Sequence, residues 1–405
     1  MARIAVLVSN PCTSDARVIK MVRGATQAGH EVHVFATSRP GVAPFEQIDG
    51  ATYHRLDWRP GPMIVEKAPL SWLAMVNRGV AMYLVKRIAP FVKYRLFSKV
   101  FAESVVRLKP DIVHAHDLIC LQAAHDVATS CGAAVVYDAH ELELHRNPPL
   151  PFFQKRWVSY VEGKYARRAA AVNTVGRLVG DVLAKHLGRD DINIIYNSPM
   201  IRVCQSNIRA DLQLPPDTPL LSYVGKVTTG RGVGEIMAVL PKLEGVFFAT
   251  VGPCDESTRR TLERQANRIG VADRFRILPP VPFEQVVSYI RGTDLGVISV
   301  EPITLSYRYC MPNKLFELSF ANVPIISNKL DEIEEFIAEL GNGDIADFEN
   351  GAALPYTIAR MFKEKQRYVM GPEVLALLHQ KYSWDTQIKR LLSVYDAILA
   401  KGNAR

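Results

Sequence analysis

Residues 219–236 read PLLSYVGKVTTGRGVGEI, and the organisation of the whole chain can be worked out from this stretch. Its first part is a short apolar run of the kind that forms a buried strand, and its last part opens a helical pattern. The glycine-rich turn between them leaves backbone N–H groups free at a helix N-terminus, where an anion can bind. The stretch therefore predicts one strand–turn–helix step of a parallel sheet with an anion site at the turn.

The same step recurs along the chain, because short β-branched runs alternate with longer helical patterns, as in stacked βαβ units. In the first half we expect strands at 3–9, 31–37, 111–117, 133–139, 170–175 and 192–197. In the second half we expect strands at 219–226, 245–252, 274–281, 295–300 and 323–328. Their near-continuous apolar character fits parallel strands that are covered on both faces.

A chain of 405 residues is too long for one ordinary core, so two domains are expected. Residues 198–220 are polar, contain prolines and show little periodicity, and we place the interdomain linker there. The predicted fold class is α/β, with two Rossmann-like, doubly wound domains facing a cleft, at residues 1–200 and 205–383. Ligands of such sheets bind outside the carboxyl ends of the strands.

Composition narrows the classes of protein. Apolar residues make up 48% and charged residues 22%, as in soluble globular proteins. No apolar stretch is long enough to span a bilayer, and the run at 3–9 is too short for a signal peptide. The six cysteines lack CxxC spacing, which predicts reduced thiols in the cytosol. The net charge is +8, but no nucleic-acid-binding motif accompanies it, so no nucleic-acid partner is expected.

Residues 63–107 depart from the alternation, because they interleave aromatic and methionine side chains with lysines and arginines and contain few acids. Two interpretations stay open. A basic, aromatic-rich amphipathic helix can lie on an anionic membrane surface. A pair of core-packing helices with a solvated basic face gives the same pattern.

Two segments of the second half could hold a diphosphate. Lys226 and Arg231 flank the turn that follows Gly225, and two cations suit a diphosphate, although a basic surface turn has the same composition. Later, Pro312 can start a helix in which Glu317 lies about one turn on. A carboxylate there can hold both hydroxyls of a ribose, but acids near a helix N-terminus also arise as ordinary dipole compensation.

Histidines mark two strand ends in the first half. The strand at 111–117 ends with His114 and His116 on one face, and the next strand leads into His140 and Glu141. The carboxyl ends of parallel strands meet at one edge, so a shared site is favoured over two satisfied core histidines.

The loop after the first strand, SNPCTSDARVIK at 9–20, leads into a helix. We take Asp15 and Arg17 in this loop as contacts to an acceptor or a phosphate. A helix N-cap and a structural arginine are the alternative.

Together these segments resemble the retaining GT-B glycosyltransferases of family 4. The resemblance lies in G-K-x₄-R-G at 225–232, an apolar strand ending in Gly252-Pro253, and PNKLFE at 312–317. It extends over nearly the whole chain, with AGHEV at 28–32 and a final helical segment at 381–399. The resemblance implies that the C-terminal helix, residues 385–405, packs back on the first domain.

The resemblance also implies roles for single residues. Lys226 and Arg231 hold the donor diphosphate and stabilise the leaving group, and Glu317 holds the ribose. His116 lines the catalytic centre and orients a sugar. His140, Glu141, Asp15 and Arg17 face the acceptor. The remaining donor-site positions are Gly225, Asn313, Lys314 and Leu315, the last three through their backbone.

One departure from the family pattern concerns the donor sugar. The usual motif is a pair of glutamates with seven residues between them, and Tyr309 stands where the first glutamate is expected. Tyr309 therefore takes the position that contacts the donor sugar in the family.

The predicted activity is transfer of a sugar from a nucleoside diphosphate sugar to a hydroxyl of a saccharide or lipid-linked acceptor, in cell-surface polysaccharide or glycolipid assembly. We expect it in the cytoplasm, on the inner face of the cytoplasmic membrane. No D-x-D pair occurs in the sequence, so neither a metal nor another cofactor is expected. Two alternatives remain open: an inverting GT-B transferase or epimerase with Asp15 or Glu141 as base, and an inactive nucleotide-sugar-binding subunit.

Overall fold

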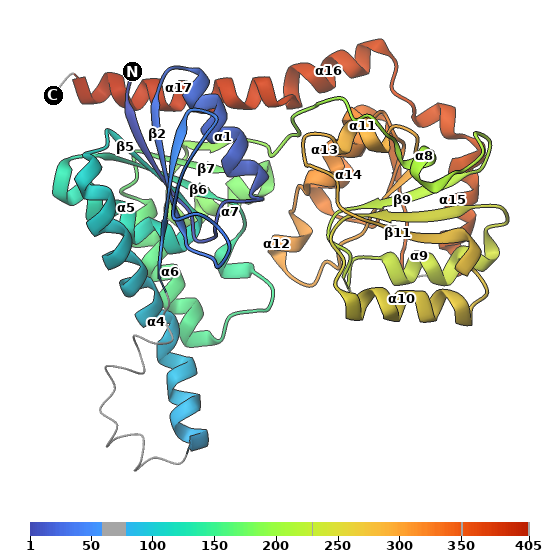
Figure 1. The fold of residues 1–405 in the computed structure, drawn as a ribbon, viewed down its shortest axis with the longest axis horizontal. Helices are drawn as coiled ribbons and strands as arrows, with labels where there is room; N and C mark the ends of the chain where they lie inside the picture. The colour runs from blue at the N-terminus through green and yellow to red at the C-terminus, as the bar shows by residue number, and fades with distance from the viewer. Residues whose placement is uncertain (59–77, 229, 350, 404–405) are drawn as a thin grey trace. The chain divides into compact units, whose positions relative to one another are not determined.

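The computed structural model describes residues 1–58, 78–228, 230–349 and 351–403, with the side chains of helix α4 described from residue 92 onward. These residues form two compact units (Figure 1). Unit 1 comprises Met1–Ile195 and Ile388–Arg405, and unit 2 comprises Tyr196–Gln387.

The segment expected to be the linker, 198–220, belongs to unit 2. It forms helix α8 (Ile208–Leu212), which Asn207 caps by accepting from the backbone of its first turn. Ile208 is fully buried, and Arg209 donates to the carbonyl of Gly292 over 2.6 Å. The linker prediction was wrong at this point, because a five-residue helix is too short to show a period in the sequence.

Unit 1 is built on an eight-stranded sheet in the order β3-β4-β2-β1-β5-β6-β7-β8. Neighbouring strands are parallel except β3 and β4. The strands are β1 (Arg3–Leu7), β2 (Glu31–Thr37), β3 (Phe45–Ile48), β4 (Ala51–Leu56), β5 (Ile112–His116), β6 (Ala134–Ala139), β7 (Ala171–Thr174) and β8 (Ile192–Ile194).

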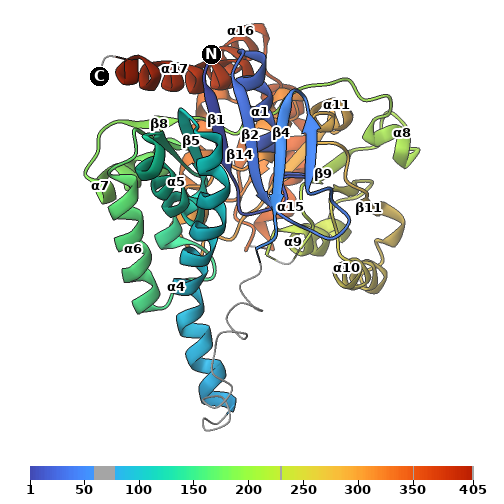
Figure 2. The same ribbon diagram turned by 60° about the vertical axis from the view of Figure 1, so that its left-hand side comes forward.

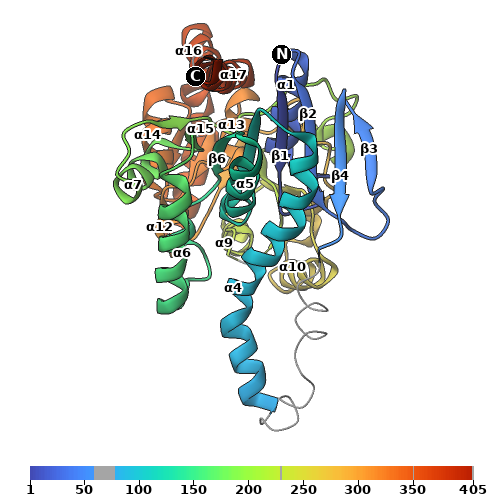
Figure 3. The ribbon, with the colours of Figure 1, turned by 90° about the vertical axis from the view of Figure 1, so that its left-hand side faces the viewer.

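Strands β3 and β4 form a hairpin at the edge of this sheet, which the sequence analysis did not predict (Figure 3). The two-residue loop is Asp49-Gly50, with φ angles of 52° and 80°. Two positive φ angles are typical of a type I′ turn, for which Asp-Gly is a preferred pair. The sequence signal for this hairpin was the pair Asp49-Gly50, with FEQI before it and ATYHRL after it.

The helices of unit 1 pack on the two faces of its sheet. Helix α4 carries Tyr94, Phe97, Phe101 and Val105 at helical spacing, and these four side chains are buried. Lys93, Arg95 and Lys99 on the same helix are exposed. From residue 92 onward α4 thus has the packed apolar face that the core-helix interpretation predicts. Residues 59–77 and the side chains of 78–91 lie outside the described part. The helices are α1 (Ala16–Gln27), α4 (Arg78–Val105), α5 (Asp117–Cys131), α6 (Phe152–Ala166) and α7 (Arg177–Leu187).

The last helix, α17 (Trp384–Asn403), contributes its residues from Ile388 onward to unit 1 (Figure 2). Ile388 lies against Gly24 of α1, where a Cβ atom would come within 2.3 Å of the isoleucine side chain. Tyr395 is fully buried, and its hydroxyl lies 2.6 Å from His114 Nδ1 on β5. Glycine on α1 therefore allows close helix–helix packing.

Unit 2 has a six-stranded, wholly parallel sheet in the order β11-β10-β9-β12-β13-β14. Counted along the chain this is the order 3-2-1-4-5-6 of dinucleotide-binding sheets. The strands are β9 (Leu220–Val224), β10 (Phe247–Val251), β11 (Phe275–Leu278), β12 (Leu295–Ile298), β13 (Ile325–Ser327) and β14 (Gly343–Ile345).

Apolar clusters cover both faces of this sheet, which explains the continuous apolar runs of its strands. One cluster contains Leu315, Phe316, Ile333 and Phe336, and the other contains Ile236, Met237, Leu262 and Ile358. The helices are α9 (Val233–Val239), α10 (Glu256–Arg268), α11 (Val286–Ile290), α12 (Leu305–Arg308), α13 (Asn313–Phe320), α14 (Asp331–Leu340), α15 (Ala353–Lys363) and α16 (Pro372–Tyr382).

Each sheet reverses its strand order at one point, between β1 and β5 in unit 1 and between β9 and β12 in unit 2. In open parallel sheets, ligands bind outside the carboxyl ends of the strands at this reversal. The loops that follow β1, β5, β9 and β12 are therefore where the site residues should be sought. Among the described helices, none is long and apolar enough to cross a membrane.

Candidate functional site

In unit 2, the glycine-rich turn joins β9 to α9 at the strand reversal. Gly225 has a φ of 115°, and Gly230 and Gly232 have φ angles of 75° and 77°, so all three adopt backbone conformations that favour glycine. Gly225 N–H donates to the carbonyl of Val251 over 2.9 Å. A Cβ atom on Gly232 would come within 2.2 Å of Ser299, just after β12. The turn is therefore folded tightly against two neighbouring strand ends.

The turn also presents the two predicted cations. Lys226 is exposed, and its carbonyl accepts from the Tyr223 hydroxyl over 3.0 Å. The Arg231 guanidinium lies 5.8 Å above the Tyr307 ring, a cation–π arrangement that holds it near α12.

Helix α13 begins at Asn313 with Pro312 as its N-cap, which confirms the predicted helix start. Asn313 is exposed, and its side-chain oxygen accepts from Asn197 over 2.8 Å. Leu315 is fully buried, and Glu317 is half-buried on the next turn. Tyr309 is the C-cap of α12, with the Arg308 guanidinium 6.0 Å above its ring.

The side chain of Lys314, predicted to act through its backbone, runs beneath the turn. It is 6% exposed, with its amine 3.6 Å above the Tyr223 ring centre. A Cβ atom on Gly225 would lie 3.7 Å from that amine. The amine has no hydrogen-bond partner among the residues that the structure describes. Burial, helped by the Arg231 charge and opposed by Glu317, lowers the pKa of Lys314 to about 7.

Unit 2 therefore brings Gly225, Arg231, Lys314 and Glu317 together, with Lys226 at the surface of the same turn. A tight glycine turn, two cations and a buried amine at a helix N-terminus are features that suit the binding of a diphosphate.

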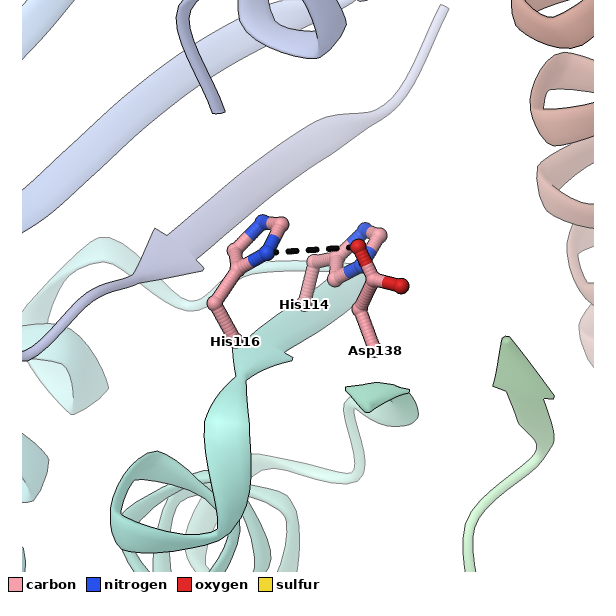
Figure 4. A group of neighbouring side chains, drawn as sticks. All are labelled: His114, His116 and Asp138. Carbon is pink, nitrogen blue, oxygen red and sulfur yellow. Dashed lines mark ion pairs between the residues drawn. The ribbon is translucent and has the colours of Figure 1, made fainter. Parts of the chain in front are cut away.

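In unit 1, the predicted histidines meet around a carboxylate that the sequence analysis missed (Figure 4). Asp138 pairs in register with His116 across β5 and β6, and its Oδ2 lies 3.3 Å from His116 Nδ1. His140 Nε2 lies 3.5 Å from the same oxygen and 2.9 Å from His116 Nδ1. The signal for Asp138 was its position two residues before His140, which puts it on the same side of the strand end.

Arg17 holds Asp138 from the other side. Its Nε and Nη2 donate to the two carboxylate oxygens over 2.9 and 2.7 Å, and its Nη1 donates to the carbonyl of Ile195 over 2.8 Å. Asp15 caps α1 by accepting from Val18 N–H, and it also accepts from Asn10. The structure thus gives both residues the structural partners of the alternative interpretation, with Arg17 only 5% exposed.

The network extends to the protein surface and to the last helix. His140 Nδ1 lies 3.3 Å from Asp117 Oδ1, and Glu141 beside it is exposed. His114 stacks on His116 with ring centres 4.6 Å apart, and its Nδ1 lies 2.6 Å from the Tyr395 hydroxyl. Sequence reasoning could not link His114 to Tyr395, because 281 residues separate them.

Burial and neighbouring charges act in opposite directions within this network. Burial alone would raise the pKa of Asp138, but Arg17 and the neighbouring His116 and His140 imidazoles hold that pKa well below its usual range. Burial alone would lower the pKa of His140, but the Asp117 and Asp138 carboxylates raise it to about 9. Burial lowers the pKa of His114 well below its usual range. At neutral pH His140 is therefore charged and His114 is neutral.

His114, His116 and Asp138 are also the ligand types that hold a metal ion, and their donor atoms lie within 4.8 Å of one another. Both oxygens of Asp138, however, already accept from the Arg17 guanidinium. A metal ion would lie next to this buried cation and would have to compete with it for the carboxylate. The geometry fits a hydrogen-bonded charge network and does not fit a metal site.

Comparison with known proteins agrees with this fold. Residues 16–198 match the model of Glycosyltransferase Family 4. The chain is 22% identical over 322 residues to D-inositol 3-phosphate glycosyltransferase 1 of Catenulispora acidiphila, covering 73% of this chain and 74% of that protein. It is 21% identical over 392 residues to an uncharacterized glycosyltransferase of Methanocaldococcus jannaschii, covering 93% and 92%.

Solved structures share the fold over nearly the full length. Sucrose-phosphate synthase from Thermosynechococcus elongatus superposes with a TM-score of 0.76 at 15% identity, covering 99% of this chain and 100% of that one. HepE of Anabaena in complex with UDP-glucose superposes with a TM-score of 0.70 at 14% identity, covering 98% and 100%.

Proposed function

We propose that this chain is a GT-B glycosyltransferase of family 4 and that it transfers a sugar from a nucleoside diphosphate sugar to a hydroxyl group with retention at the anomeric carbon. The observation that carries the proposal is the diphosphate site at the strand reversal of unit 2. There the glycine turn after β9, Arg231 and the Lys314 amine converge beside α13.

Stabilisation of the leaving group supplies most of the rate enhancement in this proposal. As the bond from the anomeric carbon to the diphosphate oxygen breaks, negative charge grows on the diphosphate. Preorganised donors aimed at such developing charge are the largest single source of catalysis in many enzymes. Lys226 and Arg231 supply cations, and the turn supplies backbone N–H groups.

For retention, we propose that the acceptor hydroxyl attacks from the face that the diphosphate leaves. The departing phosphate oxygen takes the hydroxyl proton, so no separate protein base is needed. Two observations support this. Asp15 is occupied as a helix cap, and Asp138 is bound by Arg17, so neither carboxylate is available as a base.

The test is a donor panel with the purified chain. UDP-, GDP- and ADP-sugars are screened first by thermal shift, because a ligand that binds the native state raises the apparent stability. The donor that binds is then incubated with candidate acceptors, and NMR gives the anomeric configuration of the product. Retention with EDTA present supports the proposal. Inversion, or loss of turnover on chelation that added metal restores, would contradict it, and binding without transfer or hydrolysis would identify a nucleotide-sugar-binding subunit.

We further propose a lipid-linked acceptor, reached at an anionic membrane surface on the cytoplasmic side. Helices α4 and α6 lie side by side beyond the sheet of unit 1 (Figures 1 and 2). A hollow of about 800 Å³ lies beside α6, and none of the described residues that line it is acidic. Its lining contains five cations: Lys155, Arg156 and Lys164 of α6, and Arg167 and Arg168 just after the helix. Beside it, Arg95 of α4 shares a second hollow with Tyr160 and Lys164.

Exposed aromatic side chains accompany these cations. Phe152 and Phe153 are each 67% exposed and Tyr160 is 63% exposed, which is unusual for large apolar groups. Cations with exposed aromatics on one helix fit the interface of an anionic bilayer. We call these residues the α6 surface.

Vesicle binding tests the α6 surface. The wild type should sediment with phosphatidylglycerol vesicles and not with phosphatidylcholine vesicles, and salt should weaken the binding. A variant with Lys155, Arg156 and Lys164 changed to glutamine should stay in solution. The control changes three exposed arginines of α10, Arg260, Arg264 and Arg268, to glutamine and so removes the same charge. If both variants bind alike, the α6 surface has no special role.

A further inference from the structure

The His116 ring has one engaged nitrogen and one without a partner. Nδ1 lies 2.9 Å from His140 Nε2 and 3.3 Å from Asp138 Oδ2. Nε2 is buried and has no hydrogen-bond partner among the residues that the structure describes. His116 is 1% exposed and ends β5, at the strand reversal where ligands of such sheets bind. Its second nitrogen is therefore the group offered to a ligand.

Whether Nε2 offers a proton or a lone pair depends on what Nδ1 does. A neutral imidazole carries one proton, so if Nδ1 accepts a hydrogen bond, Nε2 must be protonated. If Nδ1 instead donates to Asp138, Nε2 is a lone pair and His116 could act as a base. The tautomer thus decides the chemistry of the residue.

His140 settles the tautomer through its own two partners. Its Nδ1 faces the Asp117 carboxylate at 3.3 Å, which leaves Nε2 to face His116 Nδ1 and Asp138. When both ring nitrogens of His140 carry a proton, the Nε2–H group donates to His116 Nδ1, because that contact is shorter than the contact with Asp138. His116 then keeps its proton on Nε2.

The charge balance of the cluster points the same way. Two carboxylates, Asp117 and Asp138, face two cations, Arg17 and His140, and His114 is neutral. Glu141, which follows His140 in the sequence, is exposed. This balance favours a charged His140, whose Nε2–H is then available to His116 Nδ1.

We propose that His140, held by Asp117, is a positioning residue that locks His116 in the Nε2–H tautomer. His116 then donates a hydrogen bond from Nε2 to an oxygen of the bound saccharide. The role of the saccharide rests on the proposed function, whereas the tautomer can be observed without any substrate.

The decisive measurement is the two-bond ¹H–¹⁵N correlation spectrum of the full chain labelled at histidine. A pyrrole-type shift for His116 Nε2 and a pyridine-type shift for Nδ1 are expected, and His116→Gln assigns the signals by removing them. The reverse pattern, or an imidazolium pattern at neutral pH, would overturn the proposal. A chain with the expected tautomer but no transferase activity would refute the proposed function and leave the tautomer standing.

Two variants of His140 distinguish a role in setting the His116 tautomer from a role in packing alone. In His140→Gln the amide nitrogen lies about where Nε2 does, so it can still donate to His116 Nδ1 without a charge. This variant should keep the tautomer and most of the activity. His140→Leu has no donor, so His116 should turn its Nδ1 proton to Asp138, and kcat/KM should fall about tenfold, the value of one lost hydrogen bond. If the leucine variant keeps the Nε2–H tautomer, His140 is not the positioning residue.

Asp117→Asn provides a second route at a half-exposed position, in case the leucine variant does not fold. Without the carboxylate, His140 loses one of the two groups that keep it charged, and the His116 signals should shift toward the other tautomer as the pH rises from about 6 to 9. The wild type should show no such change over that range, apart from loss of the His140 charge near its upper end. Identical spectra for the two proteins would contradict the role of Asp117.

Discussion

At the scale of single residues, the site in unit 2 combines the cations of Lys226 and Arg231 with the buried amine of Lys314 around one turn. Arg231 stands at the turn and stabilises the developing diphosphate charge in the proposed reaction. Arg231→Ala should lower turnover at least about a hundredfold, since that is the usual effect of removing one such donor. Initial rates with the donor identified by the panel provide the measurement.

The matched control is Arg231→Lys, which keeps the charge and should retain most of the turnover. Near-normal transfer by the alanine variant would remove Arg231 from the mechanism. If alanine and lysine variants are equally slow, the guanidinium geometry matters and the charge alone does not suffice.

The buried amine of Lys314 predicts a pH dependence of donor binding. Its pKa is about 7 in the free chain, and a bound diphosphate should raise it. Binding should therefore take up a proton above pH 7, and affinity for a nucleotide-sugar should be highest below pH 7 and fall as the pH rises from there. A nucleotide-sugar is the proper probe, because its phosphates do not titrate in this range. Calorimetry in two buffers of different ionisation enthalpy measures the proton uptake, and none at pH 8 would contradict the prediction.

The buried amine of Lys314 should also lower the free energy of unfolding of the chain without ligand. The unfolded chain binds a proton at Lys314 up to about pH 10, whereas the folded chain loses it near 7, so stability rises with pH between these values. Lys314→Met removes this penalty and should raise Tm by about 2–4 °C per kcal/mol gained at neutral pH, while weakening donor binding. Both predictions would be wrong if Lys314→Met lowered Tm and if its affinity for the donor still fell with pH as in the wild type.

A site residue could be predicted from the sequence where its position depends on residues close to it in the chain. Lys226, Arg231 and the start of α13 lie on turns whose glycine and proline signals are local, and sequence reasoning placed them. The Asp138 partnership with Arg17 joins residues 121 apart, and the Lys314 side chain turned inward only because Tyr223 and Gly225 made room for it. Contacts between residues so far apart in the chain leave no local sequence pattern from which they could be predicted.

At the scale of elements, the strands with continuous apolar character were all predicted, because burial on both faces leaves a strong pattern. The β3–β4 hairpin was missed because an edge ribbon is only partly buried and carries mixed residues. Strand β14 was missed for a similar reason, since GDI at 343–345 is three residues long and only half-buried.

The turns after β9 and β10 make close contact, which predicts the effect of one substitution. A Cβ atom on Gly252 would lie 2.1 Å from the Gly225 carbonyl oxygen, and Gly252 has a φ of 150°. Gly252→Ala should lower the free energy of unfolding by about 3 kcal/mol, from the backbone strain and the clash together. Gly245→Ala is the control, because its φ is also positive at 71° but nothing lies near its Cβ, so only about 1 kcal/mol should be lost. Denaturant unfolding measures both, and equal losses would show that the two turns can move apart.

At the scale of the whole molecule, the two units differ in how the chain forms them. Unit 2 is one continuous stretch, whereas unit 1 needs both Met1–Ile195 and the residues from Ile388 onward. Residues 196–387 expressed alone should therefore unfold cooperatively and bind the donor nucleotide-sugar as tightly as the full chain does. Residues 1–195 alone should be far less stable, because they lack the α17 side chains that pack on α1 and β5. If the isolated unit 2 is unfolded while the full chain binds the donor, the units do not fold independently.

The two ends of unit 2 meet, since Tyr196 N–H donates to the side-chain oxygen of Gln387 over 3.1 Å. A module whose ends adjoin can be cut out of one gene and placed into another at two junctions, with no new span to bridge. Under the proposed function, exchanging unit 2 in this way would change the sugar donor and leave the histidine network of unit 1 in place. The preference for a donor and the preference for an acceptor would then be inherited separately. Two relatives with similar sequences in one unit would not have to share the substrate that the other unit binds.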